Sequence, residues 1–144
     1  MPTTPRSTRT AAAPAGCLGG VCDPQRTQGL LSSPKKGDYA LVTLKGPGVF
    51  LGAEITKQGG TNDLTFVILD IDGRNVTNLS YAAAKNSGLT QQNPYGLVLL
   101  SSAALKNLTI GFPSPLRYKR QLKLAVTVNE TGVVQILANV IHGT

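Results

Sequence analysis

The stretch that decides the fold lies near the C-terminus and reads LRYKRQLKLAVTV over Leu116–Val128. Apolar residues occupy most of its even-numbered positions and polar residues most of the others. Because side chains alternate across a β-strand, one face of this run is expected to be buried and the other solvated. The loop sequence NETG follows at 129–132, and then Val133–His142 continues with many β-branched residues. The pattern predicts a β-hairpin made of these two runs.

Upstream of this pair, strand-like runs alternate with Gly, Asn, Asp and Pro as far back as Asp38. The Asp72-Gly73 pair predicts a tight turn, and residues 82–85 predict one helical turn. We therefore expect an all-β domain over residues 38–144, an antiparallel β-sandwich or jelly roll of about seven to eight strands. Strand spacing does not distinguish a jelly roll from an immunoglobulin-like order. The remaining expected strands are Tyr39–Leu44, Val49–Lys57, Leu64–Ile71, Arg74–Tyr81, Tyr95–Ser101 and Leu105–Phe112.

Residues 1–37 have a different composition. They contain five of the nine prolines and five basic residues against the single acid Asp23, and they show no apolar periodicity. Proline supplies no amide donor and glycine costs backbone entropy, so this stretch is not expected to build a core of its own. We predict an extended basic arm that becomes ordered on a partner. The partner contacts are assigned to its basic residues, which are Arg6, Arg9, Arg26, Lys35 and Lys36.

The composition limits the possible functions of the chain. Its 144 residues are 41% hydrophobic and 15% charged, with a formal net charge of +7. The length fits one domain with a tail, and the positive charge permits an acidic or polyanionic partner. The first residues lack the apolar core of a secretory peptide, and no run reaches the roughly 20 apolar residues of a membrane span. We expect synthesis in a cytoplasm and no membrane partner. In a reducing compartment Cys17 and Cys22 would stay thiols, and on oxidation they could form a local disulfide.

Few side chains are available for catalysis or metal binding. Cys17 and Cys22 could supply half of a zinc site, but the sole histidine, His142, lies at the far end of the chain. Asp70 and Asp72 resemble part of a calcium loop without its later acidic ligand, and we interpret them as a strand end and a turn. The sequence therefore predicts no metal, no cofactor and no enzymatic activity.

A second group of basic residues lies in the decisive stretch itself. Arg117, Lys119 and Lys123 fall on the predicted solvated face of one strand, with no acidic residue nearby in the sequence. Such a stripe could meet phosphates or an acidic protein surface. Nucleic-acid modules usually add stacking aromatic side chains, and this face has none. We therefore favour protein contact or solubility over nucleic-acid binding, and we assign these three residues as partner-binding.

Two stretches carry a family resemblance: Asn107–Tyr118, in which a strand ends in Phe-Pro-x-Pro, and the alternating run Leu122–Val128. Together they resemble small jelly-roll or sandwich proteins of bacteriophage virions, above all capsid decoration (cement) proteins. The resemblance implies a non-enzymatic subunit on the capsid surface that binds the major capsid protein or another virion protein. It also implies that the subunit braces the shell as a homo-oligomer, with a trimer favoured. In this interpretation the arm anchors the subunit to its neighbours.

Three alternatives remain open at this point. A coat subunit could direct its basic arm toward packaged nucleic acid, which predicts a strongly salt-dependent affinity. A receptor- or glycan-binding head domain of a fibre would need exposed aromatic platforms. The residue inventory makes a small hydrolase or lyase the least favoured of the three. The aromatic candidates for a glycan platform are Tyr39, Tyr81, Tyr95 and Tyr118.

Overall fold

Alternating burial along the chain builds strands over most of the protein, which we describe from a computed structural model. The structure describes residues 17–18, 21–91, 93–94, 96–102 and 104–144. Its elements in chain order are β1 (Cys17–Leu18), β2 (Val21–Cys22), β3 (Gln25–Ser32), β4 (Gly37–Lys45), β5 (Gly48–Gly59), β6 (Thr65–Ile71), β7 (Arg74–Ser80), α1 (Tyr81–Asn86), β8 (Leu97–Ser102), β9 (Leu105–Ile110), β10 (Leu116–Tyr118), β11 (Gln121–Val128) and β12 (Val133–Gly143).

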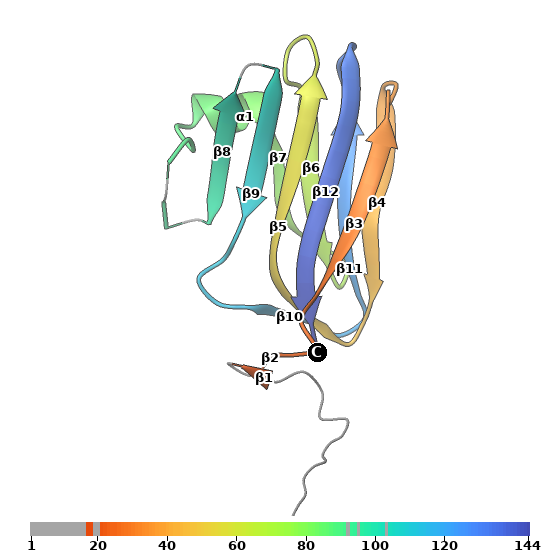
Figure 1. The fold of residues 1–144 in the computed structure, drawn as a ribbon, viewed down its shortest axis with the longest axis vertical. Coiled ribbons are helices and arrows are strands. Elements are labelled where there is room, and N and C mark those ends of the chain that lie inside the picture. Colours follow the sequence, from red (N-terminus) through yellow and green to blue (C-terminus); the bar gives the residue numbers. More distant parts are fainter. Residues whose placement is uncertain (1–16, 19–20, 92, 95, 103) are drawn as a thin grey trace, which may run out of the picture.

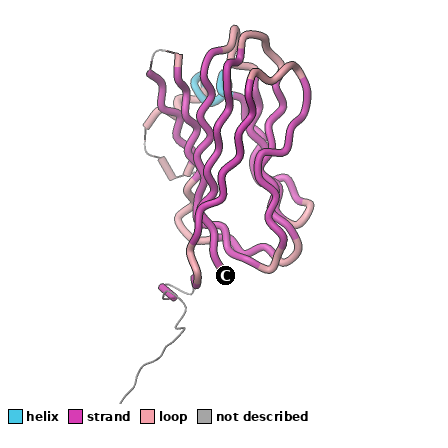
Figure 2. Tube along the Cα trace, turned by 45° about the vertical axis from the view of Figure 1, so that its right-hand side comes forward, coloured by secondary structure: helices cyan, strands magenta, loops and turns pink. Residues whose placement is uncertain are grey.

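Within the described residues, ten of these strands form two sheets that pack face to face (Figure 1). The six-stranded sheet has the order β3-β12-β5-β9-β8, with β10 paired to the start of β5. The four-stranded sheet has the order β4-β11-β6-β7. Figure 2 shows the two layers, with the short helix α1 near one end. The predicted all-β antiparallel sandwich is confirmed.

The strand order is that of a jelly roll. Four antiparallel pairs form along the chain: β3 with β12, β4 with β11, β5 with β9, and β6 with β7. Successive pairs alternate between the six-stranded and the four-stranded sheet. A long nested hairpin rolled up in this way gives the two Greek keys of a jelly roll, and β8 extends one sheet edge beyond the set of eight.

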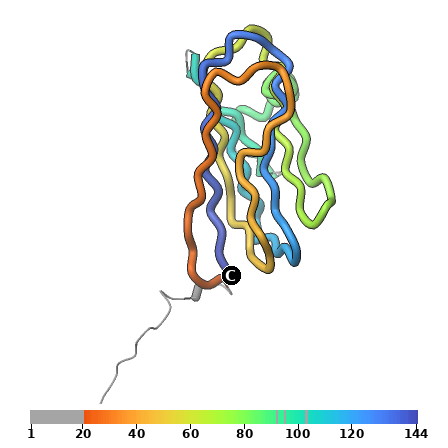
Figure 3. Tube along the Cα trace, turned by 90° about the vertical axis from the view of Figure 1, so that its right-hand side faces the viewer, coloured from red at the N-terminus to blue at the C-terminus, as the bar shows by residue number. Residues whose placement is uncertain are grey.

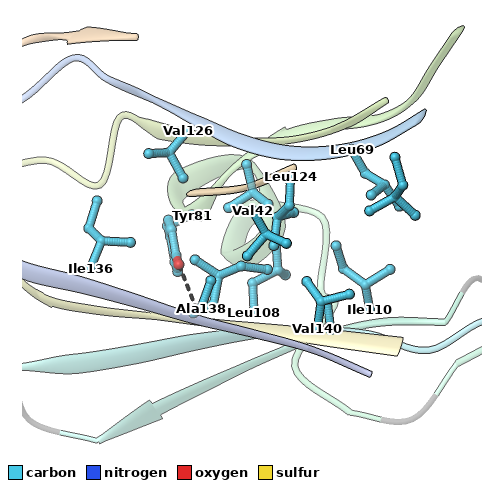
Figure 4. Close-up of a cluster of buried hydrophobic side chains, with 14 of the residues drawn as sticks. Val42, Leu69, Tyr81, Leu108, Ile110, Leu124, Val126, Ile136, Ala138 and Val140 are labelled. Carbon is cyan, nitrogen blue, oxygen red and sulfur yellow. Dashed lines mark hydrogen bonds between the residues drawn. The ribbon is translucent and has the colours of Figure 1, made fainter. Parts of the chain in front are cut away.

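The core lies between the sheets and receives side chains from both (Figure 4). Leu124 and Val126 of β11 face Ile136, Ala138 and Val140 of β12, and all five side chains are fully buried. Fully burying a Leu, Ile or Val side chain stabilises the fold by about 1.5–3 kcal/mol relative to leaving it exposed. The alternation read from the sequence therefore predicts correctly which face of β11 is buried.

The short helix α1 closes one end of this core. Its N-cap is Ser80, whose hydroxyl oxygen accepts a hydrogen bond from the Ala83 amide at 3.0 Å. The buried Tyr81 donates its hydroxyl to the Ile55 carbonyl at 2.7 Å, a bond marked in Figure 4. The predicted helical turn is confirmed. No helix among the described residues is long and apolar enough to cross a lipid bilayer.

The predicted hairpin of Leu116–Val128 and Val133–His142 is wrong. The first run divides at Lys119–Arg120 into β10, in the six-stranded sheet, and β11, in the four-stranded sheet. Because β12 belongs to the six-stranded sheet, the loop at 129–132 crosses between the sheets instead of joining neighbouring strands. Two half-apolar strands can bury their apolar faces across a core as well as side by side, so alternation predicts the buried face and not the pairing partner.

The predicted end of the arm at residue 37 is also wrong, because β3 (Gln25–Ser32) pairs along β12 as an edge of the six-stranded sheet. Its inward positions are Thr27, Gly29 and Leu31, so it shows no apolar periodicity in the sequence. Gly29 lies against β4, where an added Cβ would sit 2.2 Å from the Leu41 carbonyl oxygen. The close approach of these two edge strands explains why a glycine occupies position 29.

The long strands define two ends of the sandwich. The connection from β3 to β4 arches over one end, while the turn from β4 to β5 and the C-terminus lie at the other (Figure 3). β5 runs from the second end to the first over 12 residues. The Asp72-Gly73 pair makes the predicted tight turn between β6 and β7, with φ of 52° and 80°.

Candidate interaction sites

The basic residues assigned to the arm do not lie together. Arg6 and Arg9 fall outside the described residues. Arg26 is exposed on the edge strand β3. Lys35 and Lys36 are exposed in the connection from β3 to β4, beside the loop that joins β11 to β12. The last three residues therefore belong to the sandwich itself and not to an arm.

The second assigned group does not share one strand face. Arg117 belongs to β10, Lys119 to the turn that follows, and Lys123 to β11. Arg117 and Lys119 line one hollow near the C-terminal Thr144. Lys123 lies opposite Asp70 in the pairing of β11 with β6, on the outer face of the other sheet. The predicted stripe is therefore divided where the strand divides.

The outer face of the six-stranded sheet carries an organised row of polar side chains. Glu54 on β5 lies at its centre, and each of its carboxylate oxygens accepts an amide: one from Asn107 at 2.8 Å and the other from Asn139 at 3.1 Å. Thr109 donates its hydroxyl to Asn107 at 2.9 Å, and Gln28 donates to Asn139 at 3.3 Å. The row thus crosses β9, β5, β12 and β3. We call it the polar ladder.

Apolar side chains surround the polar ladder. Leu30 on β3 is 55% exposed and Ile141 on β12 is 39% exposed, while Leu100 on β8 is 55% exposed and Leu105 on β9 is 48% exposed. The strand registers place Leu30 opposite Leu137 on this same outer face. Exposed large apolar residues that gather around organised polar groups are typical of protein interfaces. The alternate polar positions of β5, β9 and β12 are visible in the sequence, but they do not reveal that these strands share one face.

A buried network of charges lies at the end of the sandwich where β11 connects to β12. Both oxygens of the buried Glu130 carboxylate are engaged. One accepts the backbone amides of Thr61 at 2.9 Å and Asp63 at 3.2 Å, and the other accepts the Thr65 hydroxyl at 2.5 Å. Glu130 belongs to the loop between β11 and β12, whereas Thr61 and Asp63 belong to the loop between β5 and β6, so this carboxylate joins the two loops.

The partner of Glu130 is Lys57, whose side chain is also fully buried. Its Nζ lies 3.3 Å from a Glu130 oxygen and donates to Asp63 at 2.7 Å and to the Gly59 carbonyl at 2.8 Å. Lys106 also pairs with Asp63. Partial burial alone would raise the pKa of Asp63, but the hydrogen bonds from Lys106 and Lys57 outweigh it and lower that pKa. We call Lys57, Asp63, Lys106 and Glu130 the ion-pair end.

At the opposite end, Asp72 organises the turn that divides β10 from β11. Its carboxylate accepts the backbone amides of Lys119 at 2.9 Å, Arg120 at 2.7 Å and Gln121 at 3.1 Å. These backbone bonds lower the pKa of Asp72 to about 2. The Gly46 amide, in the turn between β4 and β5, donates to the Arg120 carbonyl at 2.7 Å. The turn between β4 and β5 therefore lies against the turn that Asp72 organises.

Four exposed cations gather around Asp72. They come from three connections: Lys45 at the end of β4, Arg74 at the start of β7, and Lys119 and Arg120 before β11. We call Lys45, Arg74, Lys119 and Arg120 the basic end.

The other candidates from the sequence have structural explanations. His142 lies near the end of β12, where burial lowers its pKa and its Nε2 lies 2.7 Å from the Thr27 hydroxyl. Cys22 is disulfide-bonded, which is the oxidised one of the two states left open for it. Among the described residues, no three His, Cys, Asp or Glu side chains are placed to hold a metal ion. Tyr81 and Tyr118 are buried, at 0% and 3% exposure, so neither offers a ring as a glycan platform.

No protein-family model and no curated protein matches the chain.

Proposed function

We propose that this protein is a non-enzymatic structural subunit of a virus particle, a decoration or cement protein that binds and stabilises the capsid shell. The observation that carries the proposal is the outer face of the six-stranded sheet, where exposed leucines surround the polar ladder. In this proposal that face packs against a neighbouring copy of the chain, and the resulting oligomer, with a trimer favoured, sits on the capsid surface.

The polar ladder suits such a contact because its hydrogen bonds already exist in the single chain. Both oxygens of Glu54 accept amides from Asn107 and Asn139, so covering the face does not leave that carboxylate without partners. Side chains held in this way lose less freedom on association than free ones. Leu30 and Ile141 then supply the apolar area that favours binding.

The jelly-roll strand order supports the proposal without carrying it. Jelly rolls occur in viral capsid and lectin domains, and one fold hosts many functions. The anchoring role proposed for the arm is limited to the residues before β3, because Gln25–Ser32 is a strand of the sandwich.

The test changes one exposed leucine on the proposed contact face. We expect the full chain to form an oligomer in size-exclusion chromatography with light scattering, and Leu30→Asp to convert it to a monomer. The matched control is Val76→Asp, an apolar residue that is 43% exposed on β7 of the other sheet. This control should leave the oligomer unchanged.

Particles purified from the source culture provide the second part of the test. An antibody against the chain should label the outside of intact particles, and recombinant chain should rebind to particles stripped of it. Absence of the chain from particles would refute the decoration role. A wild-type monomer, or equal effects of the two variants, would refute the assignment of the sheet face.

A further inference from the structure

The basic end presents positive charge that the described residues do not neutralise. The three salt bridges among them all belong to the ion-pair end. Lys45, Arg74 and Lys119 form none in the part of the chain that the structure describes. Such a group of exposed cations projects a positive potential into the solvent and attracts an acidic partner.

The Asp72 carboxylate at the centre of these cations does not change that conclusion. The oxygens of the Asp72 carboxylate are occupied by the backbone amides of residues 119–121. The Arg120 guanidinium donates to the Asp72 backbone carbonyl at 2.8 Å, not to its carboxylate. The four cations of the basic end therefore surround a carboxylate whose hydrogen-bonding capacity is taken up by the backbone.

Beside these cations the surface has an open hollow of about 320 Å³. It is lined by Pro47, Gly48, Tyr118 and Thr144, and also by the basic residues Arg117 and Lys119. A hollow of this size accommodates an apolar side chain, and an apolar anchor next to charged groups is the usual composition of a protein interface.

The same hollow argues against nucleic acid as the partner. Single-stranded nucleic acid is bound by aromatic rings on which bases stack. The aromatic residue here, Tyr118, is only 3% exposed, so its ring face is not available for stacking.

We propose that the basic end binds an acidic protein segment, with an apolar side chain of that segment seated in the hollow beside Tyr118. This inference rests on the proposed function and deepens it by naming the chemistry of the shell surface that the subunit meets. The N-terminal part of the chain joins the fold at the same end, because Cys22 and Thr144 exchange two backbone hydrogen bonds of 2.7 Å.

The experiment measures binding of three fluorescent probes to the full chain by anisotropy at about 0.15 M salt. The probes are a short peptide of alternating Glu and Leu, a peptide of equal charge with Ser in place of Leu, and a single-stranded DNA of similar charge. We expect the Glu/Leu peptide to bind most tightly and its affinity to fall as salt is raised.

Two double variants with the same change in net charge locate the site. Lys45→Glu with Lys119→Glu should weaken binding of the Glu/Leu peptide by about tenfold or more. Lys35→Glu with Lys36→Glu, which line a hollow beside Glu130 of the ion-pair end, should change this affinity by less than about twofold. All four lysines are exposed, and thermal unfolding checks that both variants remain folded.

Three outcomes would overturn the inference. Equal losses in the two double variants would mean that net charge alone attracts the probe. Tighter binding of DNA, lost in the Lys45/Lys119 variant, would make nucleic acid the partner. Failure of both peptides to bind the wild-type chain would remove the site. If particles carry the chain but the peptides do not bind, only this inference fails, whereas the proposed function fails if particles lack the chain.

Discussion

At one end of the sandwich the ammonium group of Lys57 is fully buried and contacts two carboxylates, whereas at the other end Lys45 and Lys119 are exposed and form no salt bridge with the described residues. β5 connects the two ends. The Glu130 carboxylate binds groups of two loops and pairs with Lys57. The Asp72 carboxylate binds backbone amides of one turn, and the cations around it remain exposed. A net charge of +7 therefore does not say where on the surface positive charge is available.

The largest expected effect comes from breaking the ion-pair end. Replacing Glu130 by Ala leaves the buried Lys57 without one of its carboxylates and leaves the Thr65 hydroxyl and several amides without an acceptor. Removing one partner of a buried pair costs about 3–5 kcal/mol of unfolding free energy. Urea unfolding measures this loss. The control is Asp70→Ala, a half-buried carboxylate bonded to Asn75, with an expected loss below about 1 kcal/mol.

Losses of similar size in Glu130→Ala and Asp70→Ala would show that the buried network does not lock this end of the fold.

A smaller and pH-dependent effect is expected from Asp72 at the basic end. Its pKa of about 2 in the folded protein lies below the ordinary value of 3.8, so the ionised form stabilises the fold above about pH 4. This contribution is lost as the pH falls from about 4 through 2. Asp72→Asn should therefore lower the urea midpoint at pH 7, and its effect should shrink as the pH falls and vanish below about pH 2. A difference that stays constant with pH would contradict the role of these hydrogen bonds.

The smallest effect on stability is expected where the charges are free. Lys45→Glu with Lys119→Glu should change the unfolding free energy by no more than about 0.5 kcal/mol, because both side chains are exposed and unpaired in the described part of the chain. The same urea titration measures it. A loss as large as that of Glu130→Ala would mean that the basic end is structural and not a binding surface.

Alternation in the sequence predicted most strands and the buried face of β11, because burial of every second side chain is a local property. The partner of a strand is not local. The division at Lys119 and Arg120 depends on Asp72, which lies 47 residues away from Lys119. Strand β3 was missed because its inward positions include Gly29 and Thr27, which give no apolar signal.

The candidate sites show the same limit. Lys57 follows Ala53 and Ile55 on the inward face of β5, so a lysine in the core could have been read from the sequence, but its partners could not. The polar ladder joins residues of four strands, and the order of these strands in the sheet cannot be read from the sequence. Arg117, Lys119 and Lys123 were grouped as the solvated face of one predicted strand. The fold separates Lys123 from the other two and brings Lys45 and Arg74 close to Lys119.

The most direct test of the two-ended account is an NMR titration of the isotope-labelled full chain with the alternating Glu/Leu peptide. The account predicts that amide shifts concentrate at Gly46, Arg74, Lys119 and Arg120, while the amides of Thr61 and Asp63 at the ion-pair end stay in place. Shifts centred on residues 33–36 and 129–132, or spread evenly over the surface, would contradict it.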